Sequence, residues 1–177
     1  MSKEAKLLFI IAYTLVAIGI VMIYSSSGVL AYQRYGNAQY FLIRQFIFAV
    51  LGTIGFFIAA SMPIQFYKQN ARAFMLFAIL LLVIVFLPGV GHGAGGAKRW
   101  IRILGFQFQP VEFAKLACCI YLADYLSRKL PLVQKGNVLI FIPPLILIGI
   151  VCVLTILEPD LGSVAFMVML TGTVFFI

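Results

Sequence analysis

Long apolar runs separated by short polar segments dominate this chain. Six such runs cover residues 7–24, 46–62, 73–87, 112–126, 138–157 and 161–177. A helix that crosses a bilayer needs about 20 mainly apolar residues, with a range of about 17–25. Four of the runs meet that length, whereas 73–87 is short and 112–126 is both short and charged. The pattern predicts an all-α, polytopic integral membrane protein with about six transmembrane helices.

Composition excludes several classes of protein. Hydrophobic residues make up 64% of the chain and charged residues 10%, and the mean hydropathy is +1.13. Soluble domains are about 45–50% apolar and about 25% charged, so a soluble fold of 177 residues would leave much apolar surface in water. This excludes a soluble enzyme, a disordered tail and a nucleic-acid-binding domain. We expect residues 1–177 to form a single transmembrane helical domain, truncated within its last apolar run.

The net charge of +8 therefore indicates cytoplasmic loops, anionic headgroups or an anionic lipid-linked substrate rather than nucleic acid. With the N-terminus in the cytoplasm, seven Lys and Arg residues lie in inner segments and five in outer segments. This count favours a cytoplasmic N-terminus and places residues 89–109 outside. Three of the five outer charges, Lys98, Arg99 and Arg102, lie within five residues. Membrane topology gives no reason for three cations so close together on the outer side, so binding of a ligand is the other explanation for the cluster.

Lys98, Arg99 and Arg102 surround the single tryptophan, Trp100. One interpretation is that these cations reach lipid phosphates at the interface. The other is a site for a pyrophosphate, with Trp100 stacking on a sugar. The preceding glycines match G-x-G-x-x-G, but no strand precedes them, no helix opens from them, and a predicted membrane span lies on their N-terminal side, so they predict a loop rather than a nucleotide site.

Acidic residues supply the second set of candidates. Glu112 and Lys115 are three positions apart near the start of an apolar run, so they can pair on one helix face. Asp160 follows Pro159 and can cap the next helix. Each has a structural explanation, as an ion pair or a cap, and a functional one, as a group facing an outer cavity. The three cysteines have no metal-ligand spacing, so no metal site is predicted, although a divalent cation is left open as a cofactor.

Five segments occur in an order that matches one family, at residues 24–27, 41–45, 96–101, 109–115 and 158–162. Together they resemble the SEDS family (shape, elongation, division, sporulation), whose members include FtsW, RodA and SpoVE. The serine-rich first segment resembles the division and sporulation branch, and the whole chain is most similar to the N-terminal part of FtsW. Val111 stands where the family usually has Ser, and Glu158 where it usually has Gln.

The resemblance implies a ten-span peptidoglycan glycosyltransferase of cell division in the bacterial inner membrane. It would polymerise lipid II, an undecaprenyl-pyrophosphate-linked disaccharide-pentapeptide, at the outer face. Its implied partners are a class B penicillin-binding protein and other division proteins. The alternatives are a lipid II flippase and a non-catalytic membrane scaffold.

The resemblance also implies roles for individual residues. The family's catalytic Asp lies in a His-Thr-Asp-Phe-type motif that does not occur in this sequence, so we expect no catalytic residue here and no activity from the chain alone. Supporting cavity residues would be Glu112, Lys115 and Asp160. Substrate-binding residues would be Lys98, Arg99, Trp100, Arg102, Arg44 and Gln109.

Overall fold

The computed structural model describes residues 3–87, 89–93, 99–103, 106–133 and 136–176. The chain divides into two compact units, Met1–Met62 and Pro63–Ile177. Each unit is described by itself below.

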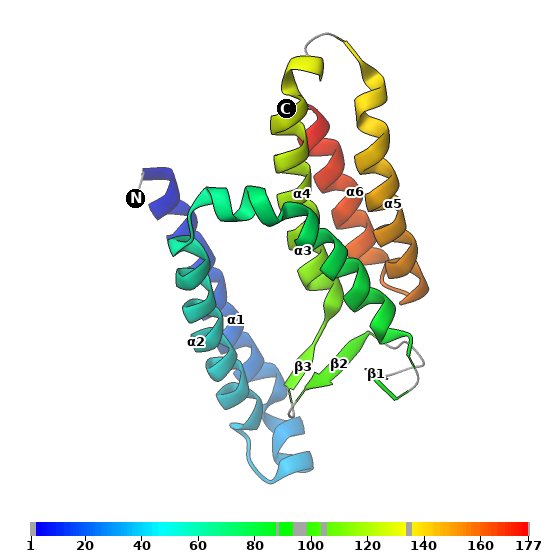
Figure 1. The fold of residues 1–177 in the computed structure, drawn as a ribbon. Helices are drawn as coiled ribbons and strands as arrows, with labels where there is room; N and C mark the ends of the chain where they lie inside the picture. The colour runs from blue at the N-terminus through cyan, green and yellow to red at the C-terminus, as the bar shows by residue number, and fades with distance from the viewer. Residues whose placement is uncertain (1–2, 88, 94–98, 104–105, 134–135, 177) are drawn as a thin grey trace. The chain divides into compact units, whose positions relative to one another are not determined.

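The first unit is a pair of helices, α1 (Lys3–Tyr35) and α2 (Tyr40–Ser61), which run side by side in opposite directions (Figure 1). Near the start of α1, the ring of Phe9 lies 5.9 Å from that of Phe56 near the end of α2. At the connecting turn, the rings of Tyr35 and Tyr40 stack with centroids 4.0 Å apart. Among the described residues Ala31 is buried in α1, and none is buried in α2. Many large apolar side chains of this unit are therefore exposed, although some, such as Phe9 and Phe56, contact one another between the two helices.

Both helices of the first unit extend beyond the predicted runs. The first predicted run ends at residue 24, but the serine-rich segment 24–27 lies inside α1. The hydroxyls of Ser26 and Ser27 donate to the carbonyl oxygen of Ile23, at 3.5 and 2.5 Å, so serine is accommodated within the helix. The second helix begins at Tyr40 rather than at residue 46, which places Arg44 within it.

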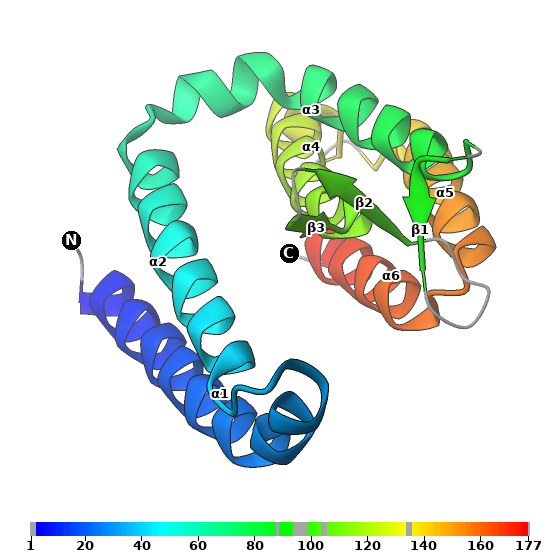
Figure 2. The ribbon, with the colours of Figure 1, turned by 90° about the horizontal axis from the view of Figure 1, so that it is seen from below.

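The second unit is a bundle of α3 (Ile64–Val85), α4 (Pro110–Val133), α5 (Ile142–Leu157) and α6 (Leu161–Phe176). The last three run side by side and α3 crosses them (Figures 1 and 2). On α3 the buried residues recur every three or four positions, as one face of a helix requires. That face packs on α4, and small side chains allow the close approach of the two helices. The core consists of Met75, Ala78, Leu82, Val111, Ala114, Ala117, Cys118, Tyr121, Leu122, Ile148, Val151 and Met167.

A small antiparallel sheet lies between α3 and α4 in the sequence. Its strands are β1 (Gly91–His92), β2 (Trp100–Ile103) and β3 (Phe106–Phe108), in that order. In the register, His92 pairs with Trp100 and Arg102 with Gln107. The sheet lies at the end of the bundle where α4 and α6 begin (Figure 1). Sequence analysis predicted only a loop here, because strands of two to four residues are too short for a period-two pattern to be visible.

Among the described residues, the six α-helices confirm the predicted all-α membrane fold. Four segments there are long and apolar enough to cross a membrane by length and composition: α1, α2, α3 and Val138–Leu157. The last joins a 3-10 helix, η1 (Val138–Phe141), to α5, so the helix type changes just before Pro143 and Pro144. This agrees with the break that two consecutive prolines predict. The remaining two helices are the shorter apolar α6 and the more charged α4.

Candidate functional site

The turn between α5 and α6, residues 158–160, is bound to both ends of the β2–β3 hairpin. Arg99, just before β2, donates from Nε to the carbonyl oxygen of Glu158 at 2.6 Å, and from Nη2 to the carbonyl oxygen of Pro159. Gln109, just after β3, donates from Nε2 to Oδ2 of Asp160 at 3.2 Å. Three consecutive residues thus hold both flanks of the hairpin. Neither attachment is local in sequence.

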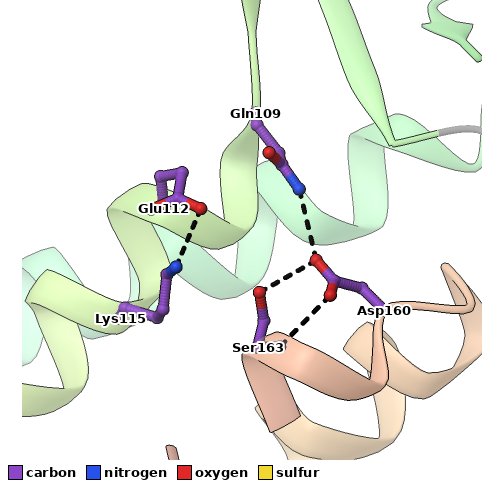
Figure 3. Close-up of polar contacts among 5 residues, drawn as sticks. All are labelled: Gln109, Glu112, Lys115, Asp160 and Ser163. Atoms are coloured by element: carbon purple, nitrogen blue, oxygen red, sulfur yellow. Dashed lines mark hydrogen bonds and ion pairs between the residues drawn. The ribbon is translucent and has the colours of Figure 1, made fainter. Parts of the chain in front are cut away.

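Asp160 is the cap of α6. Its Oδ1 accepts a hydrogen bond from the backbone N–H of Ser163 at 3.1 Å, and its Oδ2 accepts one from the Ser163 hydroxyl at 2.8 Å. A carboxylate at this position satisfies a backbone N–H that would otherwise be unpaired and suits the helix dipole. The predicted cap is therefore confirmed. Figure 3 shows that the same carboxylate also accepts from Gln109, so it joins the start of α4 to the start of α6.

The ion pair of Glu112 and Lys115 lies beside this cap (Figure 3). Lys115 Nζ lies 2.8 Å from Glu112 Oε1, which confirms the pairing expected from their spacing. The two partners differ in exposure: 20% of the lysine side chain is exposed, against 58% of the glutamate. Lys115 Nζ also lies 5.4 Å from the ring centroid of Phe166 on α6, a cation–π contact. Lys115 on α4 is thus held against Phe166 on α6, whereas the carboxylate of Glu112 is accessible to solvent or a ligand.

Strand β2 presents Trp100 and Arg102 on one face, because alternate residues of a strand point the same way. Ile101 between them is buried. Trp100 is 37% exposed, and Arg102 is exposed without a hydrogen-bond or ion-pair partner among the described residues. Arg99 differs, since its guanidinium is half-buried against the α5–α6 turn. Lys98 lies outside the described residues.

Glu158 is the residue that sequence analysis missed, apart from its departure from the family pattern. It is 1% exposed, and neither carboxylate oxygen has a hydrogen-bond partner among the described residues. Burial raises its pKa from 4.5 to about 7; the nearby Asp160 adds to this rise, and Arg99 opposes it. The available signal was an acid directly after an apolar run, but that position is equally typical of an exposed residue in a turn.

Arg44 lies in the other unit. Its Nη1 is 3.4 Å from the hydroxyl of Tyr40, and its guanidinium carbon lies 5.8 Å from the centre of that ring. Its assignment to the substrate site stays a prediction.

No set of donors for a metal is present in the described part of the chain. Groups of three or more His, Cys, Asp or Glu side chains do not occur together there. The side chains of the described residues therefore do not form a site that fits a divalent cation, and no step of the reaction proposed below involves one.

A family model described as "Cell cycle protein" (FTSW_RODA_SPOVE) matches residues 5–177. The chain is 34% identical over 166 residues to the probable peptidoglycan glycosyltransferase FtsW of Trichlorobacter lovleyi, which covers 92% of this chain and 42% of that protein. It is also 34% identical over 165 residues to stage V sporulation protein E of Bacillus subtilis, with 92% and 44% covered. The chain therefore spans about two fifths of the length of these curated relatives.

Two solved structures have a similar fold. A structure described as "Structural coordination of polymerization and crosslinking by a peptidoglycan synthase complex" matches with a TM-score of 0.65 at 27% identity, covering 85% of this chain and 44% of that one. The rod shape determining protein RodA of Thermus thermophilus matches with a TM-score of 0.63 at 26% identity, covering 84% and 48%.

Proposed function

Since the chain belongs to the FtsW/RodA/SpoVE family of multi-pass membrane proteins, we propose that it serves in a division-type peptidoglycan glycosyltransferase. The substrate is lipid II, polymerised at the outer face of the bacterial inner membrane. The N-terminus is cytoplasmic, in accord with the distribution of Lys and Arg. A class B penicillin-binding protein and other division proteins are its partners. The similarity to a protein of a peptidoglycan synthase complex supports such an assembly.

The observation that carries the proposal is that an exposed cation, Arg102, and a partly exposed indole, Trp100, lie on one face of β2 at the end of the bundle. The reaction is attack of an acceptor sugar hydroxyl on an anomeric carbon, with a lipid pyrophosphate as the leaving group. Negative charge develops on that pyrophosphate, so the site needs fixed cations there. Arg102 is available for this contact, and Trp100 on the same face is available to stack on a sugar. The β2–β3 hairpin is therefore the substrate-binding element in this proposal.

None of the described carboxyl groups is assigned as the proton acceptor. Both oxygens of Asp160 already accept hydrogen bonds, and Glu112 is paired with Lys115. Glu158 is buried away from any substrate. The base implied by the family resemblance, in a His-Thr-Asp-Phe-type motif, does not occur in this sequence. Glu112, Lys115 and Asp160 serve here as supporting residues of the cavity.

A chimera tests the proposal. Residues 1–177 would replace the matching part of the Trichlorobacter lovleyi relative, and the purified chimera would be given lipid II in vesicles. We expect glycan strands on a gel, lost when the His-Thr-Asp-Phe-type Asp is replaced by Asn. Translocation of lipid II without polymer would favour a flippase instead. If the chimera is folded and inserted but shows neither polymerisation nor translocation, the result would favour the scaffold.

A further inference from the structure

Arg99 lies next to an acidic residue but does not form an ion pair with it. Its guanidinium donates to the backbone carbonyl oxygens of Glu158 and Pro159, and the carboxylate of Glu158 accepts no hydrogen bond from any described residue. A guanidinium normally prefers a carboxylate, because a charge-assisted hydrogen bond is about twice as strong as one to a neutral acceptor. The observed choice is therefore the one expected when the carboxyl group is uncharged.

The surroundings of Glu158 favour an uncharged carboxyl. The side chain is 1% exposed, and an ionised carboxylate without hydrogen-bond donors is costly in such a place. The charged groups that act on it are Asp160, ahead of α6, and Arg99, on the segment before β2. Asp160 disfavours a second negative charge, and Arg99 favours it. With a pKa of about 7, the carboxyl changes its charge in the physiological range.

We infer that Arg99 is a positioning residue, and that the charge on the Glu158 carboxyl decides whether it holds the β2–β3 hairpin on the α5–α6 turn. When the carboxyl is neutral, Arg99 binds the two carbonyls and fixes the hairpin at the end that begins with Trp100. When the carboxyl loses its proton to solvent, the carboxylate draws the guanidinium away from those carbonyls. This end of the hairpin then shifts, while the Gln109–Asp160 contact still holds the other end.

The inference rests on the proposed function only for its effect on substrate binding. If Trp100 and Arg102 bind lipid II, the same proton sets how those two side chains are presented to it. The movement itself depends on contacts within this chain. It can therefore be tested without substrate.

Trp100 is the single tryptophan of the chain and follows Arg99 directly, so its fluorescence reports this end of the hairpin. The test measures its emission from pH 5.5 to 8.5 with the chain in lipid nanodiscs. We expect a shift of the emission maximum with a midpoint near pH 7. Glu158→Gln should keep the low-pH spectrum at every pH, because it removes the charge while retaining the shape. Arg99→Lys should keep the high-pH spectrum, because one ammonium cannot bind both carbonyls as the guanidinium fork does.

The matched control is His92→Gln, because His92 pairs with Trp100 across β1 and β2 and is the only histidine. The transition should survive this change. A transition that disappears in His92→Gln and persists in Glu158→Gln would overturn the inference, as would an unchanged spectrum in the unaltered chain. Should Glu158→Gln fail to fold, a wild-type-like transition in Arg99→Lys would overturn it equally. Because no lipid II is present, an inactive chimera would reject the proposed function and leave this result unaffected.

Discussion

Gln109 donates a hydrogen bond to Asp160 across 51 positions of sequence, and so joins the start of α4 to the start of α6. The same carboxylate caps α6 through both the backbone and the hydroxyl of Ser163. One side chain therefore serves two purposes, a local cap and a link between helices. Its removal should affect more than the end of one helix.

Replacing Asp160 with Ala should lower the free energy of unfolding by about 1–2 kcal/mol, since loss of a cap alone costs about 0.5–2 kcal/mol. Unfolding in mild detergent, followed by circular dichroism, measures this. Ser163→Ala is the control, because it removes the hydroxyl donor but retains the backbone contact to Asp160. An Asp160→Ala loss no greater than that of Ser163→Ala would show that the cap and the link contribute little.

Replacing Glu112 with Gln should cost less than about 1 kcal/mol of stability, because its side chain is more than half exposed and exposed pairs contribute about 0–1 kcal/mol. In the chimera, however, polymerisation should fall, since Lys115 loses the anion that positions it. Lys115→Met should be more destabilising, because it also ends the contact with Phe166. The opposite pattern, with stability lost and polymerisation unchanged for Glu112→Gln, would make the pair structural.

Replacing Arg102 with Ala should weaken lipid II binding about tenfold or more, since a hydrogen bond to a charged group contributes about 1.5–3 kcal/mol. Binding can be followed through Trp100 fluorescence. Lys129→Ala is the matched control, because Lys129 is an exposed cation toward the other end of α4. Equal losses in both variants would point to general attraction between a basic chain and an anionic lipid.

The stability of the fold should fall as the pH rises from about 4.5 to 7. Burial raises the pKa of Glu158 to about 7 in the folded state, so the folded chain binds more protons than the unfolded chain in this interval. The stability that comes from the neutral carboxyl is complete below pH 4.5 and is lost as the pH passes 7. Comparing unfolding at pH 5 and pH 8 measures the difference, which Glu158→Gln should reduce. A difference of the same size in that variant would assign it to other groups.

The topology predicts that position 107 is outside and position 129 inside. Gln107→Cys on the exposed part of β3 should react with a membrane-impermeant maleimide in intact cells, and Lys129→Cys only after lysis. The unaltered chain supplies the background from its own three cysteines. Labelling of position 129 but not 107 in intact cells would reverse the orientation.

The sequence predicts the helices well because burial and lipid both select long apolar runs. It misplaces their ends where serine, tyrosine or a single arginine continues a helix, as at Ser27 and Arg44. Contacts within one helical turn, such as Glu112 with Lys115, follow from spacing alone. The contacts of Arg99 with the turn after α5 join residues 59 and 60 positions apart, which no local pattern can indicate. Whether Glu158 is buried depends on the same distant contacts.

None of the described residues of α2 is buried, whereas α3 and α4 have buried residues that pack tightly against one another. This difference affects which substitutions each helix can accept during evolution. Positions on α2 need an apolar side chain but not one of a particular size, so replacing one large apolar residue with another should change stability little. Positions such as Ala78, Ala114 and Ala117 are constrained in volume, since an added methylene there would force two helices apart. In related chains, the size and shape of the apolar side chains should therefore vary widely along α1 and α2. Residue size should vary little at the positions where α3 and α4 pack together.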